Sequence, residues 1–217
     1  MPLQNRVDPF GDIHAVRDRG LFTGNRGIIH DPATKTLLKK RWATKAWIIC
    51  ECEFQGRRRE VMGAHNNPRG GVGWTELFFL DEVTALATGH RPCFYCRRAA
   101  ATDFVAGFGE AFGIAGPKAP ELDARLHAER MASGVDLARH VDRQKFKKLP
   151  DGAMVFQGER TFAKRKGRLR AWTFGGWGDA WDFLDLAAYD TWLITPPTTV
   201  AVLAAGYKPV WHPSIGP

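Results

Sequence analysis

Residues 77–98, LFFLDEVTALATGHRPCFYCRR, decide the fold of this 217-residue chain. The apolar run at 77–80 has the composition of a buried strand. Asp81 is placed to cap a short helix over residues 82–88, because an Asp side chain accepts hydrogen bonds from free N–H groups of the first helical turn. Gly89 is the residue type that ends such a helix in a left-handed conformation. The segment therefore predicts a strand followed directly by a capped helix.

A Pro-Cys-x-x-Cys turn comes next and carries the main chemical signal of the chain. Its thiols, Cys93 and Cys96, lie at the start of a second helix, predicted over residues 97–112. Two thiols at this spacing in a tight turn form half of a common zinc site. A helix N-terminus also favours the thiolate over the thiol. We therefore predict that Cys93 and Cys96 bind zinc.

The same segment resembles the second half of the zinc-binding module of Ada-type DNA-alkylation-repair proteins. In that module a strand and a helix lead into an Ala-Gly-aromatic-Arg-Pro-Cys-x-x-Cys run. The matching residues are Ala85, Leu86, Ala87, Gly89, Arg91, Pro92, Cys93 and Cys96, with His90 in the aromatic position. The resemblance covers about a tenth of the chain and implies a zinc-stabilised fold that binds DNA. It does not imply the reaction of Ada, because the upstream Cys-x-x-x-Cys or His-x-x-x-Cys pair of that module has no counterpart.

Composition limits the class of protein. With 44% hydrophobic residues, the chain can bury one substantial core, so we expect a single α+β domain over residues 1–217. No apolar run approaches the roughly 20 residues that span a bilayer, and the N-terminus lacks a signal-peptide pattern. Four cysteines do not make a disulfide scaffold. These observations predict a cytoplasmic protein with reduced thiols and no membrane partner.

We expect three parts in this domain, built from small mixed sheets with strand-helix units. Residues 1–20 are predicted to be an irregular lead-in, 21–134 a half built around the zinc motif, and 150–217 a β-rich half. Residues 192–209 repeat the order strand, cap, helix, glycine and proline of the first segment, without its cysteines. An old duplication and a chance similarity of such units are both open interpretations.

Alternation and turn residues predict further elements. Residues 46–54, AWIICECEF, alternate between apolar and acidic side chains, which indicates a strand with one solvent-exposed face. Its apolar face holds Ile48, Cys50, Cys52 and Phe54. Other predicted elements are a hairpin partner at 58–62, a helix over 120–132, strands at 153–157, 160–164 and 168–174, and a Gly- and Trp-rich loop at 175–181.

The cysteine pair needs further ligands. A closed tetrahedral zinc site takes two more, and a catalytic site takes one more plus water. The candidates are Cys50, Cys52, His65, His90 and His127. The two additional cysteines share a strand face with apolar residues, which favours an interpretation as core residues. His65 lies in a loop and His90 fits the aromatic position, so His127 is assigned as the third ligand.

A second zinc signature is present in reversed order. His-Ala-Glu at 127–129 and Pro-Cys-x-x-Cys at 92–96 are the two motifs of zinc nucleobase deaminases, in which the Glu moves protons on a zinc-activated water. Within a helix, residues i and i+2 point roughly 200° apart, so His127 and Glu129 would face different directions. Asp123 shares the face of His127 instead. Deamination therefore stays an alternative that requires the helix to begin or break near His127.

The charge of the chain predicts an anionic partner. The net charge is +8, and four basic runs at 57–59, 97–98, 145–148 and 164–170 concentrate it. Such a distribution is typical of proteins that bind the phosphates of nucleic acid. We assign DNA binding to Arg26, Arg57, Arg58, Arg97, Arg98, Lys164, Arg165, Lys166 and Arg168.

Missing signals narrow the chemistry. The chain has no P-loop, which argues against a nucleotide cofactor, and no Gly-x-Ser-x-Gly elbow or familiar nuclease motif. Eight Trp residues, many beside basic residues or Gly, suit the stacking of an extruded base. Base excision then needs a carboxylate or amide that places water and steadies an oxocarbenium-like sugar.

We therefore expect a DNA glycosylase-like enzyme that acts on damaged or modified bases. The candidate catalytic residues are Asn25, Asp123, His127 and Glu129. A zinc-stabilised DNA-binding module without catalysis explains the charge and the cysteines equally well. A scaffold protein whose cysteines belong to the core is a third class.

Overall fold

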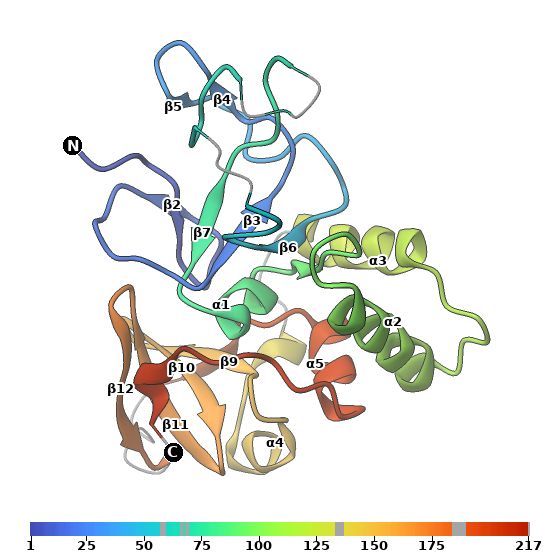
Figure 1. Ribbon diagram of the computed structural model, residues 1–217. Coiled ribbons are helices and arrows are strands. Elements are labelled where there is room, and N and C mark those ends of the chain that lie inside the picture. The colour runs from blue at the N-terminus through green and yellow to red at the C-terminus, as the bar shows by residue number, and fades with distance from the viewer. Residues whose placement is uncertain (57–59, 66, 68–69, 133–136, 184–189, 217) are drawn as a thin grey trace.

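The computed structural model describes residues 1–56, 60–65, 67, 70–132, 137–183 and 190–216. Two main sheets lie on either side of a short central helix, α1 (Glu82–Ala87), and the other helices gather to one side of these sheets (Figure 1). This mixture of helices and strands confirms the predicted α+β class. Among the described helices, none is long and apolar enough to cross a membrane.

The first sheet has six strands in the order β2-β1-β7-β3-β6-β8. Its central strand, β3, pairs antiparallel with both β6 and β7, whereas β8 runs parallel to β6. Two of its strands lie within residues 1–20, so the prediction of an irregular lead-in was wrong. The bounds are β1 (Arg6–Val7), β2 (Ile13–His14), β3 (Phe22–Asn25), β6 (Ile48–Glu51), β7 (Leu77–Phe79) and β8 (Arg91–Pro92), with a separate hairpin of β4 (His30–Asp31) and β5 (Thr36–Leu37).

The second sheet is an antiparallel five-stranded sheet in the order β12-β11-β10-β9-β13. It confirms the three strands predicted at 153–174. The predicted loop at 175–181 is instead a strand, because Trp177 pairs with Trp172 across the sheet and buries its indole. The bounds are β9 (Met154–Gln157), β10 (Arg160–Arg165), β11 (Arg168–Thr173), β12 (Gly176–Trp181) and β13 (Thr191–Leu193).

The helices follow local capping signals. Helix α2 ends at Gly113 in the left-handed conformation, and α4, which was not predicted, begins where the Asp142 side chain accepts from the Lys145 N–H. The predicted hairpin partner of β6 lies partly outside the described residues, and its described part, 60–62, is not a strand. The bounds are α2 (Arg98–Phe112), α3 (Ala119–Met131), α4 (Arg143–Lys148), α5 (Pro197–Ala204), η1 (Leu137–Arg139) and η3 (Pro213–Ile215).

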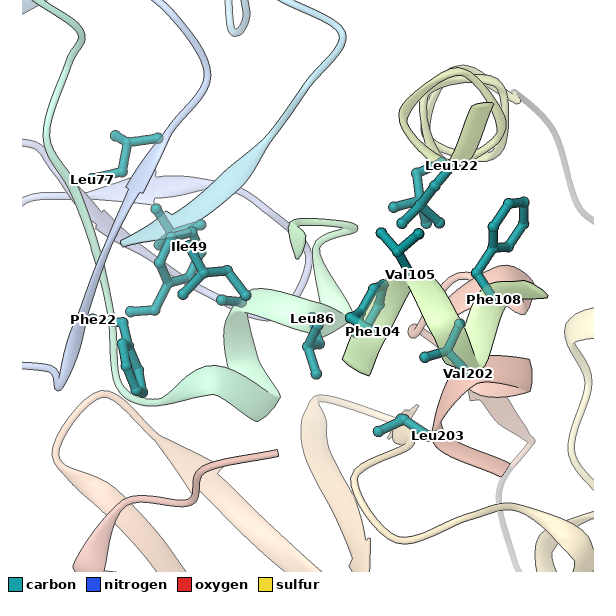
Figure 2. Packing of buried hydrophobic residues seen from close by; sticks show 14 of the residues in the cluster. Phe22, Ile49, Leu77, Leu86, Phe104, Val105, Phe108, Leu122, Val202 and Leu203 are labelled. Atoms are coloured by element: carbon teal, nitrogen blue, oxygen red, sulfur yellow. The ribbon is translucent and has the colours of Figure 1, made fainter. Parts of the chain in front are cut away.

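Helix α1 faces two hydrophobic cores, and all six of its residues are buried. Leu86 packs into the larger core, where Figure 2 shows side chains of the first sheet on one side of it and side chains of α2, α3 and α5 on the other. Val83 and Ala87 pack into a second core with Met154 and Trp177 of the second sheet. The far face of that sheet forms a third core with α4. The two halves of the chain therefore pack on a shared helix.

Two buried carboxylates at the start of α1 join these parts. Asp81 caps the helix at the Thr84 N–H (2.9 Å) and also accepts from Trp177 Nε1 (2.7 Å) and from the His212 N–H (3.0 Å). The predicted Asp cap is thereby confirmed. Glu82 accepts from three donors, Arg97 Nη1 (2.8 Å), the Tyr207 hydroxyl (2.6 Å) and the Val210 N–H (2.9 Å).

The repeated strand-helix units both form. In the first, β7 leads into α1 and then Gly89 at a φ of 78°; in the second, β13 leads into α5 and then Gly206 at a φ of 109°. These φ values are ones that favour glycine. The units belong to different sheets, so the repeat is one of local structure.

Candidate metal centre and its cavity

Three cysteines converge beside the first sheet. The Sγ atoms of Cys50, Cys93 and Cys96 all lie within 4.8 Å of one another. Zinc–sulfur bonds of about 2.3 Å in a tetrahedron place sulfur atoms about 3.8 Å apart, which is compatible with the spacing of these thiols. Among the residues that the structure describes, no other group of three His, Cys, Asp or Glu side chains meets this spacing.

Strand pairing brings the cysteines together. The parallel pairing of β8 with β6 places Ile49 opposite Pro92, and the Cys93 N–H continues the ladder by donating to the Ile49 carbonyl (2.9 Å). The Pro-Cys turn therefore starts beside Cys50, the residue after Ile49. The turn then passes into α2, as the sequence predicted.

Backbone N–H groups point at two of the sulfur atoms. The Tyr95 N–H donates to Cys93 Sγ (3.3 Å), and the Glu51 N–H donates to Cys96 Sγ (3.4 Å). Such bonds stabilise a thiolate. These donors therefore suit sulfur atoms that carry negative charge.

The three thiols also hydrogen-bond with one another, which separates their pKa values. Hydrogen bonds with Cys50 and then Cys96 lower the pKa of Cys93 to about 2, and hydrogen bonds with Cys93 and Cys96 raise the pKa of Cys50 far above its ordinary value. A hydrogen bond with Cys50 lowers the pKa of Cys96, but a hydrogen bond with Cys93 and burial raise it, and the net shift is upward. Three thiols this close, with the pKa of one strongly lowered, suit a soft or borderline divalent cation, which displaces their protons on binding.

The histidine candidates lie elsewhere. His127 packs edge-on against Trp42, with ring centroids 4.6 Å apart, and is not part of the cysteine group. The third member of the cysteine group is Cys50, where the sequence analysis had assigned His127. His65 is exposed. His90 is buried between Phe79 and Trp47, with ring centroids 4.8 and 5.0 Å away.

The cysteine cluster opens into a cavity of about 290 Å³. Its floor is one face of the first sheet, where Thr23 of β3 lies between Cys50 and Phe78. Asn25, the next residue on that face of β3, is opposite Ile48. The aromatic walls and floor come from Phe54, Trp74, Phe78 and Tyr95.

An amide and a carboxylate lie at the end of the cavity away from the cysteines. Asn25 Oδ1 accepts from the Gly27 N–H (2.7 Å), which fixes the amide plane. The buried Glu76 accepts from the Met62 N–H at Oε2 (2.9 Å). Continuing the β3–β7 register by one residue places Glu76 opposite Asn25. The cavity therefore joins thiols, aromatic rings and a polar pair.

The other predicted catalytic residues have structural partners. Asp123 receives two hydrogen bonds from Arg91, at 2.9 and 2.8 Å, in a buried ion pair. Glu129 accepts from the N–H and the hydroxyl of Thr198, at 3.2 and 2.5 Å, and so ties α3 to α5. Of the four residues that the sequence suggested for catalysis, only Asn25 lines the cavity.

Three residues assigned to DNA binding are buried. Arg97 pairs with Glu82 (2.8 Å) and Glu51 (3.1 Å), and Lys164 donates to the backbone carbonyls at the end of α4. Arg26 is 1% exposed. The charged groups of Arg97 and Lys164 therefore serve internal contacts, because burial separates them from any phosphate at the surface.

The remaining basic residues divide between surface and undescribed positions. Arg98, Lys166 and Arg168 are exposed, and the half-buried Arg165 lies over the Trp211 ring, 4.9 Å from its centroid. Of the exposed residues, Lys166 and Arg168 belong to the β10–β11 hairpin. Arg57 and Arg58 lie outside the described residues.

The sequence analysis missed two parts of this site. Cys50 was assigned to the core because its strand neighbours are apolar, and it is indeed buried, but its Sγ faces the cluster. Glu76 was not considered, although a polar residue directly before a buried strand was a usable signal. No family model, curated protein or solved structure proved similar to this chain.

Proposed function

We propose that the cysteine cluster binds zinc and that the adjoining cavity receives a nucleobase of DNA, so that the protein excises damaged or modified bases. The observation that carries the proposal is the single cavity shared by the cysteines, the aromatic rings and the Asn25–Glu76 pair. Its volume of about 290 Å³ is near the lower end for small-ligand pockets, which suits one base.

The donor set fits zinc. Three thiols, one already favoured as a thiolate, prefer borderline or soft cations over magnesium or calcium. Cys52 lines the same cavity, but its thiol is outside the cysteine group and donates to the Leu21 carbonyl (3.3 Å), so water is the simplest fourth ligand. Zinc bound there would tie β6 to the Pro-Cys turn and so hold one wall of the cavity in place.

The polar pair and the aromatic rings account for base excision. Rings such as Trp74 and Tyr95 offer faces on which an extruded base can stack. The Glu76 carboxylate is suited to orient water and to stabilise positive charge on the sugar as the base departs, and the Asn25 amide to hydrogen-bond the base. The net charge of +8 supplies the long-range attraction to DNA.

A panel of labelled DNAs tests this proposal. Plain, alkylated, deaminated and bulky naturally modified DNAs are incubated with the protein and run on denaturing gels with and without alkali. Strand breaks that need alkali mean base loss, and the sensitive DNA identifies the substrate class. Glu76→Gln is expected to abolish the breaks while DNA binding persists, and the exposed Glu159→Gln serves as the matched control. An intact panel, with DNA shifted on a native gel, would instead indicate a zinc-stabilised binding module.

Deamination is a second candidate, favoured by the three cysteines at the cavity wall, since some zinc deaminases hold their metal with three thiolates. In that mechanism a Glu must reach the metal-bound water. Here Cys50 and Glu76 are two strands apart, and neighbouring strands are about 4.8 Å apart, so the separation is roughly twice that. Base excision, which needs no contact between the carboxylate and the metal, fits better. Mass spectrometry of the treated DNA separates the two, because deamination changes a base and excision removes it.

A further inference from the structure

We infer that a second cavity of about 760 Å³ binds a nucleotide, through both its phosphate and its base. The cavity lies where the N-terminal segment, the end of α1, the end of α3 and β13 meet, and it shares no lining residue with the cysteine cavity. The inference goes beyond the proposed function, because it concerns a different site and stands without the metal.

Four arginines make this cavity positive. Within the described residues, none of them forms an ion pair with a carboxylate, and their hydrogen bonds to protein go mainly to backbone carbonyls. The four are Arg26, Arg41, Arg130 and Arg139. A carbonyl orients a guanidinium without neutralising it, so the positive charge is available to an anion.

Two of these guanidinium groups lie against one indole ring. Arg26 Cζ is 4.1 Å and Arg130 Cζ is 4.2 Å from the Trp47 ring centroid. Burial first, and then the charge of Arg130, lowers the pKa of Arg26 to about 9. Among the described residues, neither Arg26 Nη2 nor Arg130 Nε has a hydrogen-bond partner, and both atoms are buried. An anion in the cavity would offset the repulsion between these two charges.

The carboxylates of the lining do not cancel this charge. Among the described residues that line the cavity, only Asp12 and Glu129 are acidic. Glu129 is already bonded to Thr198, and Asp12 is exposed. Two negative groups facing four guanidinium groups leave the cavity net positive.

Aromatic rings complete the recognition surface. They are Phe10, Trp42, Trp47, Phe156 and Trp192, of which Phe10 is 54% and Trp42 is 36% exposed. Exposed rings beside guanidinium groups suit a ligand that is planar at one end and anionic at the other. A nucleotide has both features, whereas free phosphate has only the anionic one and an unphosphorylated nucleoside has only the planar one. The nucleotide could be a free monophosphate or part of a single DNA strand.

Calorimetric titration with deoxyadenosine monophosphate, deoxyadenosine and inorganic phosphate tests the inference. The monophosphate is expected to bind at least about ten-fold more tightly than either half, since it alone contacts both the guanidinium groups and the aromatic rings. Arg41→Gln and Arg139→Gln should each weaken it about ten-fold. Arg41 is exposed, so its removal spares the fold, and the exposed Arg143→Gln in α4 should bind as the wild type does.

A ten-nucleotide single strand identifies the source of the ligand. Tight binding of the monophosphate supports a free nucleotide, and binding only of the strand supports a nucleotide within DNA. Absence of binding by both, equal binding of phosphate alone, or wild-type affinity in both Arg41→Gln and Arg139→Gln would overturn the inference. Glu76→Gln should leave this binding unchanged, so a failure of base excision and a failure of this site are distinguishable.

Discussion

Asp81 links three segments through one carboxylate. Burial raises its pKa, and hydrogen bonds from the N–H groups of Thr84 and His212 and from Trp177 oppose that rise. Asp81→Ala would leave these donors buried without an acceptor, at a cost of about 1–3 kcal/mol each. We expect the free energy of unfolding in urea to fall by about 3–5 kcal/mol. Asp190, which is 79% exposed, is the control; a loss in Asp81→Ala as small as in Asp190→Ala would contradict the assignment.

His90 gives the fold a dependence on pH. Burial, and then the charges of Arg26 and Arg130, lower its pKa well below 6.5. The folded protein keeps the ring neutral, whereas the unfolded chain takes up a proton below about pH 6.5. The unfolded state therefore binds more protons as the pH falls, and stability is lost below about pH 6.5 by up to about 1.4 kcal/mol per pH unit.

Replacing the ring isolates this effect. His90→Phe keeps an aromatic side chain between Phe79 and Trp47 and removes the titrating group. Urea unfolding of both proteins at several pH values between 5 and 7 should show a flatter curve for the variant. Parallel curves would mean that His90 takes up its proton equally in the folded and unfolded states, which would contradict a lowered pKa.

At the scale of elements, the sequence predicts what is local. The Asp81 cap, the helix end at Gly89 and the Pro-Cys turn each depend on residues a few positions apart, and each was predicted. Strand β12 was missed because its pairing with β11 and the burial of Trp177 outweigh the glycines around it. Cys50 was misjudged for the same reason, because only the β6–β8 pairing brings it to the turn.

The Pro-Cys turn should depend on its metal. If zinc joins β6 to the turn, removing it with a chelator removes binding free energy of about 4 kcal/mol when zinc is in thousand-fold excess over its Kd. For a chain of this size, that loss lowers Tm by about 8–16 °C. Differential scanning calorimetry should show this drop for the wild type, and Cys93→Ser should start low and not respond. A wild-type Tm that stays the same when the chelator is added would argue against a metal that stabilises this turn.

At the scale of the molecule, the shared helix α1 predicts a single cooperative transition. Val83→Ala weakens the core of the second sheet and Leu86→Ala weakens the core of the first. Each substitution is expected to cost about 1–5 kcal/mol. Unfolding followed by tryptophan fluorescence and by circular dichroism should give coincident curves in both variants. Two separated transitions, each shifted by one variant alone, would mean that the halves are independent domains.

The sequence gives the net charge of the molecule directly, but it does not show which charged side chains lie at the surface. A net charge of +8 is visible in composition, but composition cannot distinguish an arginine at the surface from one held inside. Arg97 and Lys164 complete internal contacts, and Arg26 lies under a cavity. The two proposed sites are therefore cavities whose residues come from segments far apart in the sequence.

Elemental analysis of the protein purified without chelator tests the central claim, that the cysteine cluster is a metal centre. We expect about one zinc ion per chain in the wild type, since the three cysteines form one site. Cys50→Ser and Cys93→Ser should both lose the metal, while His127→Ala should keep it. Wild-type protein without bound metal, or full zinc in Cys50→Ser, would contradict the account.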